Sequence, residues 1–185
     1  MLKKLKILMM IGSVALLILI GWFLFLKDDY KQIENEVYSL DQMETQIVHI
    51  EIIDDYALAI YRWDGLGSGV IEFEKTLFGW KMTSGISEWS YGGLQFVKLE
   101  NFSVIQQSVV RDAENIHVEL QNGESYPVAI IKGENTSPRW YYYSATEDLA
   151  GATVTTYDKD GQVVEEIQVP HEPSGGAVTQ VEEQS

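Results

Sequence analysis

The most pronounced feature of the hydropathy pattern is an apolar run from Ile7 to Leu26 that contains no charged residue. As a helix, about 20 residues at ~1.5 Å rise cover about 30 Å, the thickness of the hydrocarbon core of a bilayer. Backbone groups in lipid need hydrogen-bond partners within the segment, which makes a helix the expected conformation. We therefore predict a transmembrane anchor over 7–26, with Trp22 in the aromatic belt near its second end.

The charges that flank this run predict its orientation. Lys3, Lys4 and Lys6 precede it, and an excess of lysines marks the cytoplasmic side, so 1–6 is expected in the cytosol and the remaining chain outside. A cleaved signal peptide is the alternative, but the apolar run is long for one and no small-residue cleavage pattern follows it. A buried core helix fits a charge-free run of this length less well.

The segment 27–46 shows a helical period directly after the anchor. Apolar residues recur there at three- and four-residue spacing, and Asp28 and Asp29 suit a first helical turn, where the helix dipole favours negative charge. A stalk that dimerises as a coiled coil is one interpretation, but barely two heptads are present. We therefore expect this helix to pack on the following sheet through Tyr30, Ile33, Val37, Leu40 and Met43.

From Ile47 onward the pattern is typical of β-strands, and the predicted fold class is α+β, mainly antiparallel β. In 70–75, Ile71 and Phe73 share one face while Glu72 and Glu74 share the other, which predicts one buried and one solvated side. The glycines of 64–69 predict a turn, and 84–93 reads as a Gly- and Ser-rich loop. Strands are expected at 47–53, 56–63, 70–75, 77–82 and 94–99.

The second half of the domain repeats this pattern. Asn122-Gly123 is the strongest hairpin signal in the chain, and Asp158 to Gly161 predicts a second hairpin turn. The final segment, 170–185, has few large apolar residues and is predicted to be a disordered tail. Strands are expected at 102–110, 116–120, 126–132, 140–143, 153–157 and 162–169.

The β-rich region 47–169 divides into two similar-looking parts, 47–99 and 102–169. Each part has an acidic break, at Asp54 and at Asp112, and each continues to a strand that contains Trp80 or Trp140. A tandem duplication is one interpretation. Coincidence among short strands of similar length is the other.

Composition narrows the range of partners. The chain has 28 acidic and 13 basic residues and a net charge of −15, which opposes binding to nucleic acid because phosphates require a basic surface. It opposes tight contact with anionic head groups or wall polymers as well, unless a cation bridges them. The chain has no Cys, which excludes thiolate metal sites, Cys nucleophiles and a lipoprotein anchor.

No motif for catalysis, a cofactor or a metal rises above background. Asp158 to Gly161 resembles part of a calcium loop, but Thr156 and Ile167 stand where that loop needs an acid and a Glu. His49, His117 and His171 lack neighbours at zinc-ligand spacing. A nucleophile elbow is absent from the sequence, and many acids but no defined pair are available for sugar cleavage.

Aromatic residues are the remaining candidates for a binding surface. In small β domains Trp and Tyr more often fill the core, and this is our interpretation of Trp80 and Trp140. Alternation along Trp140 to Tyr143 sends two rings to each face of a strand, so one face is a candidate contact surface. The candidate contact residues are Trp89 and Tyr91 in the Gly-rich segment, together with Tyr141 and Tyr143.

Several short motifs occur in an order that resembles one group of proteins. They are Ala57 to Tyr61, Gly69 to Ile71, Phe78 to Lys81, Ile116 to Val118, Trp140-Tyr141 and Tyr157 to Gly161. The order resembles that of uncharacterised single-pass, membrane-anchored proteins of Bacillus-type Gram-positive bacteria. The resemblance covers most of the β-rich region and implies an extracytoplasmic location, but it supplies no activity and no functional residues.

These observations predict a non-enzymatic interaction module held at the cell membrane. Its expected partner is an envelope protein or peptide, bound through a sheet edge or an aromatic patch. The alternative is a module that binds cell-wall glycan through Trp89 and the face of Tyr141 to Tyr143. A hydrolase with unassigned carboxylates ranks third.

Overall fold

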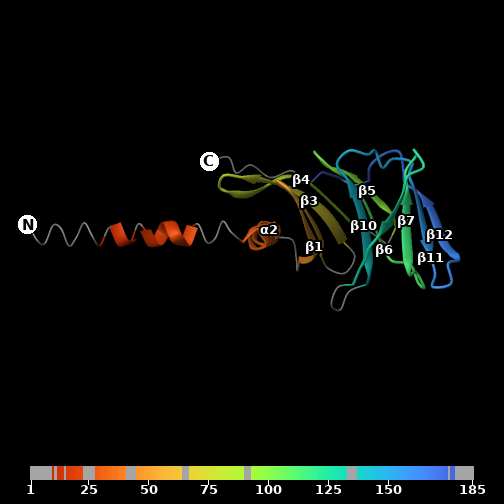
Figure 1. The fold of residues 1–185 in the computed structure, drawn as a ribbon, viewed down its shortest axis with the longest axis horizontal. Helices are drawn as coiled ribbons and strands as arrows, with labels where there is room; N and C mark the ends of the chain where they lie inside the picture. The colour runs from red at the N-terminus through yellow and green to blue at the C-terminus, as the bar shows by residue number, and fades with distance from the viewer. Residues whose placement is uncertain are drawn as a thin grey trace, which may run out of the picture.

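The chain forms mainly antiparallel β-sheets with little helix, as predicted. The computed structural model describes residues 10, 12–14, 16–22, 28–40, 45–63, 67–89, 93–132, 137–174 and 176–177. The helix α2 (Asp29–Tyr38) and three sheets follow one another as layers from left to right in Figure 1.

Sheet A is built from four consecutive strands and one returning strand. The first four are β1 (Gln46–Ile53), β2 (Tyr56–Trp63), β3 (Gly67–Thr76) and β4 (Gly79–Trp89), each antiparallel to the next. β13 (Gly176–Ala177) adds to the far side of β4. The β1–β2 turn places Asp54 at a φ of 54°, a conformation that a short polar side chain tolerates.

Sheets B and C are made from the remaining chain. Sheet B has the order β5 (Gln95–Lys98), β6 (Ser103–Ser108), β10 (Arg139–Ser144) and β9 (Ile130–Ile131). Sheet C has the order β12 (Val163–Gln168), β11 (Thr153–Tyr157), β7 (Asn115–Glu119) and β8 (Ser125–Val128). The predicted hairpin turns are present, with Gly123 at a φ of +85° and Gly161 at +77°.

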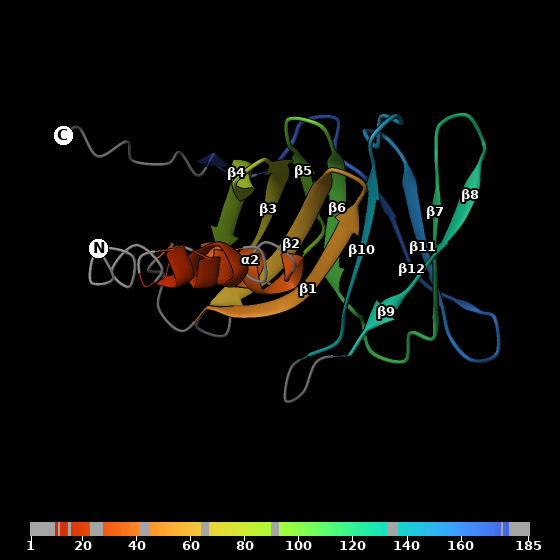
Figure 2. The same ribbon diagram turned by 60° about the vertical axis from the view of Figure 1, so that its left-hand side comes forward.

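The helix α2 (Asp29–Tyr38) covers the outer face of sheet A (Figure 2). Asp28 caps it, since its Oδ1 accepts a hydrogen bond from the Lys31 amide at 3.0 Å. Ile33 and Val37 are fully buried against sheet A and Leu40 packs beside them, so the helix packs on the sheet as expected. Tyr30, also expected at this face, is 56% exposed instead, and Met43 lies outside the described residues. It ends at Tyr38, before the predicted end of the stalk, and 41–44 lie outside the described residues.

Strand alternation separates the apolar residues into three cores. In β2, Ala57, Ala59 and Tyr61 face α2, while Leu58 and Ile60 face sheet B, which explains why this strand is apolar without interruption. A third core lies between sheets B and C and contains Phe96, Ile105, Ile116, Val118, Trp140 and Val154. The core placement of Trp80 and Trp140 is confirmed, with 5% and 2% of each residue exposed.

One predicted solvent-facing residue is buried instead. Glu74 is exposed, but Glu72 is fully buried because sheet B covers its side of β3. Its carboxylate accepts a hydrogen bond from the Asn101 backbone amide at 3.0 Å and another from the Asn101 side chain. Burial of a carboxylate is tolerable only with such partners, and here they join the β5–β6 turn to sheet A.

Two local predictions in the first half are wrong. Leu77 and Phe78 form the β3–β4 turn and are 90% and 79% exposed, so the predicted strand at 77–82 begins at Gly79. The predicted loop at 84–93 is a strand as far as Trp89, because Gly and Ser there pair with β3 through backbone groups that need no side-chain signal.

The tail prediction is wrong for its first part. Ser174 donates its amide to the Phe96 carbonyl at 2.7 Å, and Gly176–Ala177 pairs with β4. Composition misses this order because backbone hydrogen bonds, not burial of side chains, hold the segment. Residues 178–185 lie outside the described residues.

The two predicted halves share one sheet. β5 from the first half pairs with β6 from the second, and the turn at 99–102 joins them within sheet B. Duplication therefore stays a prediction.

The described part of the apolar N-terminal run is helical and exposed. Residues 10, 12–14 and 16–22 are helical, and Leu17, Ile18 and Leu19 are 65–68% exposed. Figure 1 draws this segment apart from the sheets. Within the described part of the chain no single helix combines the length and the hydropathy that a bilayer crossing needs. Ile7 and Leu26 lie outside the described residues.

Candidate functional site

A groove of about 460 Å³ lies where one edge of sheet B meets the borders of sheets A and C. Sheet A contributes β1, sheet B contributes β10 and part of β9, and sheet C contributes the end of β8. The groove is lined by His49, Glu51, Pro127, Val128, Ala129, Ile131, Tyr141, Tyr142 and Tyr143.

The backbone along one side of β10 is left open at this groove. β6 pairs with all six residues of β10, whereas β9 pairs only with Arg139 and Trp140. Alternate residues of an antiparallel strand direct their N–H and C=O groups to opposite sides, so part of the backbone of Tyr141–Ser144 faces away from β6 without a strand beside it. Such an edge is a template for another strand.

The path of the preceding chain creates this opening. β8 pairs with β7 in sheet C, and after Ala129 the chain enters sheet B, where Ile130 pairs with Trp140. The chain therefore crosses between sheets at the point where continued pairing would have covered Tyr141. Figure 2 shows β8 and β10 diverging above β9.

Tyr141 and Tyr143 are both at the groove, as neighbours on one face of β10. Their rings stack with centroids 6.3 Å apart and an interplanar angle of 15°. Alternation along β10 places Trp140 and Tyr142 in the contacts with sheet C and Tyr141 and Tyr143 in those with sheet A. Both faces are therefore packed against other sheets, and the two candidate tyrosines are half-buried.

A polar cluster of three side chains lies at one wall of the groove. The Tyr141 hydroxyl donates to Glu51 Oε2 at 3.2 Å, and His49 Nε2 lies 2.9 Å from the same oxygen. The His49 and Tyr141 ring centroids are 5.3 Å apart. Burial raises the pKa of Tyr141, and the negative charge of Glu51 raises it further, so Tyr141 remains a neutral donor at physiological pH.

The chemistry of this groove suits binding. Among the described residues that line it, none is a Ser, Thr, Cys or Lys that could act as a nucleophile beside His49 and Glu51. Its walls combine aliphatic and aromatic surface with a few hydrogen-bonding groups, which is the usual composition of a recognition site. The unpaired edge of β10 adds backbone donors and acceptors.

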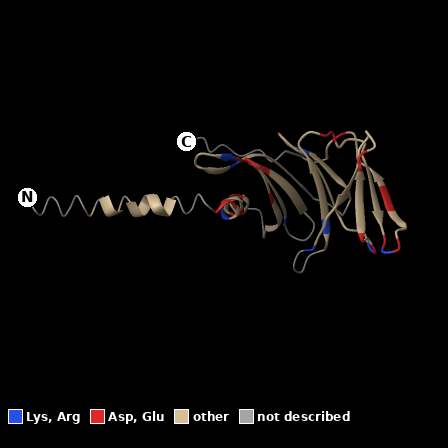
Figure 3. Cartoon of the chain, viewed as in Figure 1, with Lys and Arg blue, Asp and Glu red and all other residues tan. Residues whose placement is uncertain are grey.

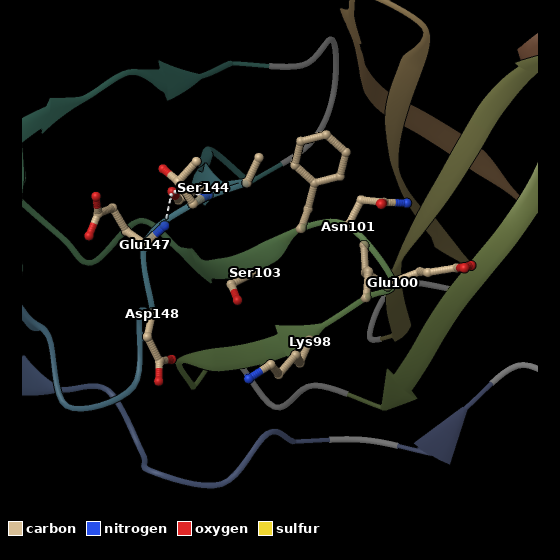
Figure 4. A pocket seen from close by; sticks show the side chains of 11 residues that line it. Lys98, Glu100, Asn101, Ser103, Ser144, Glu147 and Asp148 are labelled. Carbon is tan, nitrogen blue, oxygen red and sulfur yellow. Dashed lines mark hydrogen bonds between the residues drawn. The ribbon is translucent and has the colours of Figure 1, made fainter.

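A second pocket of about 240 Å³ lies where β10 ends at Ser144 and is more polar (Figure 4). Several of its polar groups already bond within the protein. Ser144 Oγ accepts the Glu147 amide at 2.9 Å, and Asn101 binds Glu72. Figure 4 shows Lys98 and Asp148 extending from opposite walls. We therefore regard the groove as the stronger candidate.

Of the other two sequence-predicted contact residues, only Trp89 belongs to the described residues. Trp89 ends β4 and pairs with Gly67, and two strands separate β4 from β1 at the groove. Tyr91 lies outside the described residues. The structure therefore brings Tyr141 and Tyr143 together but does not bring Trp89 to them.

The sequence-predicted ligand candidates do not converge. Among the residues that the structure describes, no three His, Asp or Glu side chains lie close enough to hold a metal ion. His117 lies on β7, where its ring meets Tyr157 edge-on at 5.8 Å. Asp158 forms a turn, since its Oδ1 accepts the Asp160 and Gln162 amides at 2.9 and 2.8 Å.

Sequence reasoning missed His49 and Glu51 as parts of a site. Glu51 and Tyr141 are 90 positions apart, and neither belongs to a motif that would predict their contact. The only signal in the sequence was the alternation of His49 and Glu51 with apolar residues in β1. Such alternation predicts which face of the strand a side chain shares, but not which residue it contacts. Comparisons with protein-family models, with curated proteins and with solved structures find no match to this chain.

Proposed function

We propose that this protein is an interaction module that binds an extended peptide segment of a protein partner by strand addition to the open edge of β10. The observation that carries the proposal is the groove along Tyr141, Tyr142 and Tyr143, where β9 ends after two pairs and leaves backbone groups of β10 without a strand partner among the described residues. Strand addition supplies affinity through backbone hydrogen bonds, while adjoining pockets select alternate side chains.

The dimensions and chemistry of the groove fit this mode. Four residues, Tyr141–Ser144, present about 13 Å of edge at ~3.3 Å per residue. The side chains of a bound strand would point alternately toward His49 and Glu51 on β1 and toward Pro127 and Val128 on β8. One side therefore offers an acceptor carboxylate and the other an apolar surface.

Glycan binding through the same tyrosines receives less support. A sugar ring stacks on a free aromatic face, whereas Tyr141 and Tyr143 stack on each other and are half-buried. Glu51 also engages the hydroxyl of Tyr141.

A photo-crosslinking experiment tests the proposed edge. We would place p-benzoylphenylalanine at Tyr143 of the full chain in its native membrane, with Val164 on β12 as the control position, since it is 41% exposed and belongs to sheet C. We expect a protein adduct at position 143 that position 164 does not give, with the crosslink mapped to one short segment of the partner. Identical adducts at both positions, no adduct, or a glycan adduct at 143 would overturn the proposal.

We further propose that 7–26 anchor the module in the cell membrane with 1–6 in the cytosol and the β-sheets outside. The support is the charge-free run itself, the lysines before it, and the exposure of Leu17, Ile18 and Leu19 in its described helical part. The charged side chains are confined to the rest of the described chain, as Figure 3 shows.

The absence of Cys makes the orientation directly measurable. Single-Cys variants Val164→Cys and Lys4→Cys would be treated in intact cells with a membrane-impermeant maleimide. We expect labelling at position 164 in intact cells and at position 4 only after lysis. The reverse pattern would contradict the orientation, and a soluble mature chain that starts after Leu26 would contradict the anchor.

A further inference from the structure

Two arginines, Arg62 of sheet A and Arg139 of sheet B, lie near each other, and neither has a carboxylate partner among the described residues. Within the described part of the chain, Arg62 hydrogen-bonds the neutral side chain of Gln46, through Nε at 3.1 Å and through Nη2. The Nε of Arg139 is shielded from solvent and has no hydrogen-bond partner. Neither guanidinium pairs with a carboxylate of any residue that the structure describes.

Paired strands hold both arginines in place. Arg62 lies in β2 between Gln46 of β1 and Ser68 of β3, and Arg139 lies in β10 between Ser108 of β6 and Ile131 of β9. Both backbones are therefore fixed from two sides. Tyr141 of β10 contacts Glu51 of β1. Arg139 lies two residues before Tyr141 on the same face of β10, and it is therefore directed toward the Gln46 end of β1.

This arrangement is unfavourable unless a further group joins it. Burial lowers the pKa of Arg139, and the positive charge of Arg62 lowers that pKa further because two cations repel each other. An unsatisfied buried donor adds a desolvation cost. Both arginines nevertheless remain partly accessible, so a ligand could reach them.

The chain also has many acids that could have neutralised this pair. It carries 28 Asp and Glu against 13 Lys and Arg, yet among the residues with described placement Lys75 pairs with Asp29 while Arg62 and Arg139 pair with no carboxylate. Two forked guanidinium groups with free donors match the geometry of a planar or tetrahedral oxyanion.

We propose that Arg62 and Arg139 form a binding site for a small oxyanion, either a carboxylate or a phosphate group. The site is independent of the peptide groove, since neither arginine lines it. The anion would accept hydrogen bonds from the unpaired donors of both arginines and neutralise their charges, and the Gln46 amide would hold Arg62 in the receiving orientation.

Calorimetric titration of the full chain in detergent micelles tests the site. Inorganic phosphate and sodium acetate would be titrated separately at constant ionic strength, so that general screening is matched. We expect saturable binding of at least one anion. Arg62→Gln and Arg139→Gln should each weaken it about tenfold or more, as expected for the loss of a charge-assisted hydrogen bond. Arg111→Gln, in the exposed β6–β7 turn, is the matched control and should bind like the wild type.

The unfolding temperature without added anion provides a second readout. Removal of an unpaired, partly buried cation should leave this temperature unchanged or raise it, whereas loss of a purely structural arginine lowers it. If Arg139→Gln does not fold, Arg62→Gln still decides the question. Binding of acetate alone would assign a carboxylate ligand, and binding of phosphate alone a phosphate ligand. Absence of saturable binding by either anion, or equal affinity in the wild type and Arg62→Gln, would overturn the proposal.

Discussion

Of the two edges of sheet B, the β5 edge is covered by another segment of the chain, whereas the β10 edge is largely open. At the β5 edge, Ser174 returns from the end of the chain, donates its amide to the Phe96 carbonyl at 2.7 Å and accepts the Phe96 amide at 3.3 Å. At the β10 edge, pairing with β9 ends at Trp140, and Tyr141, Tyr142 and Tyr143 line a groove. Proteins usually cover or blunt exposed strand edges, and the described part of this chain covers only the β5 edge.

This difference suggests which edge has been left for a partner. The segment that covers β5 continues into Gly176–Ala177, which pairs with β4, so one short stretch closes the borders of two sheets. On the other side, the chain moves away from β10 although it lies within one residue of further pairing. We infer that the path of the chain between sheets C and B leaves the β10 edge open, and that a shortage of residues to cover this edge is not the cause.

The largest expected effect is on the free energy of unfolding, and it tests whether β5 and β10 are packed equally well into the core. Phe96 on β5 and Trp140 on β10 point into the same core between sheets B and C and are 1% and 2% exposed. Phe96→Ala and Trp140→Ala should each lower the free energy of unfolding by about 3–5 kcal/mol in denaturant titrations. Val164→Ala, on the exposed face of β12, should change it by about 0.5 kcal/mol or less. A small effect at Trp140 alone would mean that β10 is poorly anchored and that its open edge reflects weak packing.

Removal of the covering segment should make the two edges alike. A chain truncated after Pro173 loses the Ser174 hydrogen bonds and the β13–β4 pairing, and should lose about 1–3 kcal/mol of stability. Hydrogen exchange at β5 should then rise toward the rate at Tyr141–Ser144. Truncation after Ala177 keeps these contacts and serves as the control. Unchanged exchange at Phe96 after the shorter truncation would show that the tail does not protect this edge.

How far the sequence predicts such features depends on the range of the interactions. The turns at Asn122-Gly123 and Asp158 to Gly161 follow from local backbone chemistry and were predicted. The burial of Glu72 and the return of Ser174 were not, because their partners Asn101 and Phe96 lie far along the chain. The hydropathy pattern predicts which face of a strand is buried, but it does not predict which other sheet or segment covers that face.

The candidate site shows the same limit. Tyr141 and Tyr143 could be named from the aromatic run alone, and the structure places both at the groove. His49 and Glu51 join them only through the packing of sheet A on sheet B, and Trp89 is kept apart by strand order. The open edge itself depends on where Ala129 leaves sheet C, which no local pattern reports.

A smaller effect is expected from the polar wall of the groove. Glu51→Ala removes the acceptor of both the Tyr141 hydroxyl and His49 and should cost about 0.5–1.5 kcal/mol, since hydrogen bonds contribute modestly to net stability. Peptide crosslinking at position 143 should weaken far more than stability does if this carboxylate contacts the partner. Glu166→Ala, on the exposed side of β12, is the matched acidic control for both measurements. Equal crosslinking yields in the two variants would exclude Glu51 from recognition.

The smallest predicted effect is a change in stability that appears only at alkaline pH. It tests whether Tyr141 is packed against β1 at the groove wall or exposed to solvent. Burial raises the pKa of Tyr141, with the charge of Glu51 adding to it, whereas a tyrosine in the unfolded chain titrates near ~10. Above about pH 10 the unfolded chain releases this proton while the folded chain retains it, so the free energy of unfolding must fall as pH rises through that window. Below it, the contribution is constant.

Tyr141→Phe removes this titration and should make the decline in stability above about pH 10 shallower than in the wild type. Denaturant midpoints measured between about pH 8 and 11 would show the difference in slope. Tyr38→Phe, at a position 54% exposed on α2, is the control. Other half-buried tyrosines with a raised pKa, such as Tyr143, will leave part of the decline in place. If the Tyr141→Phe slope equals that of the wild type, the Tyr141 hydroxyl is solvated, the contact with Glu51 is absent in solution, and the groove wall at β1 is open rather than packed.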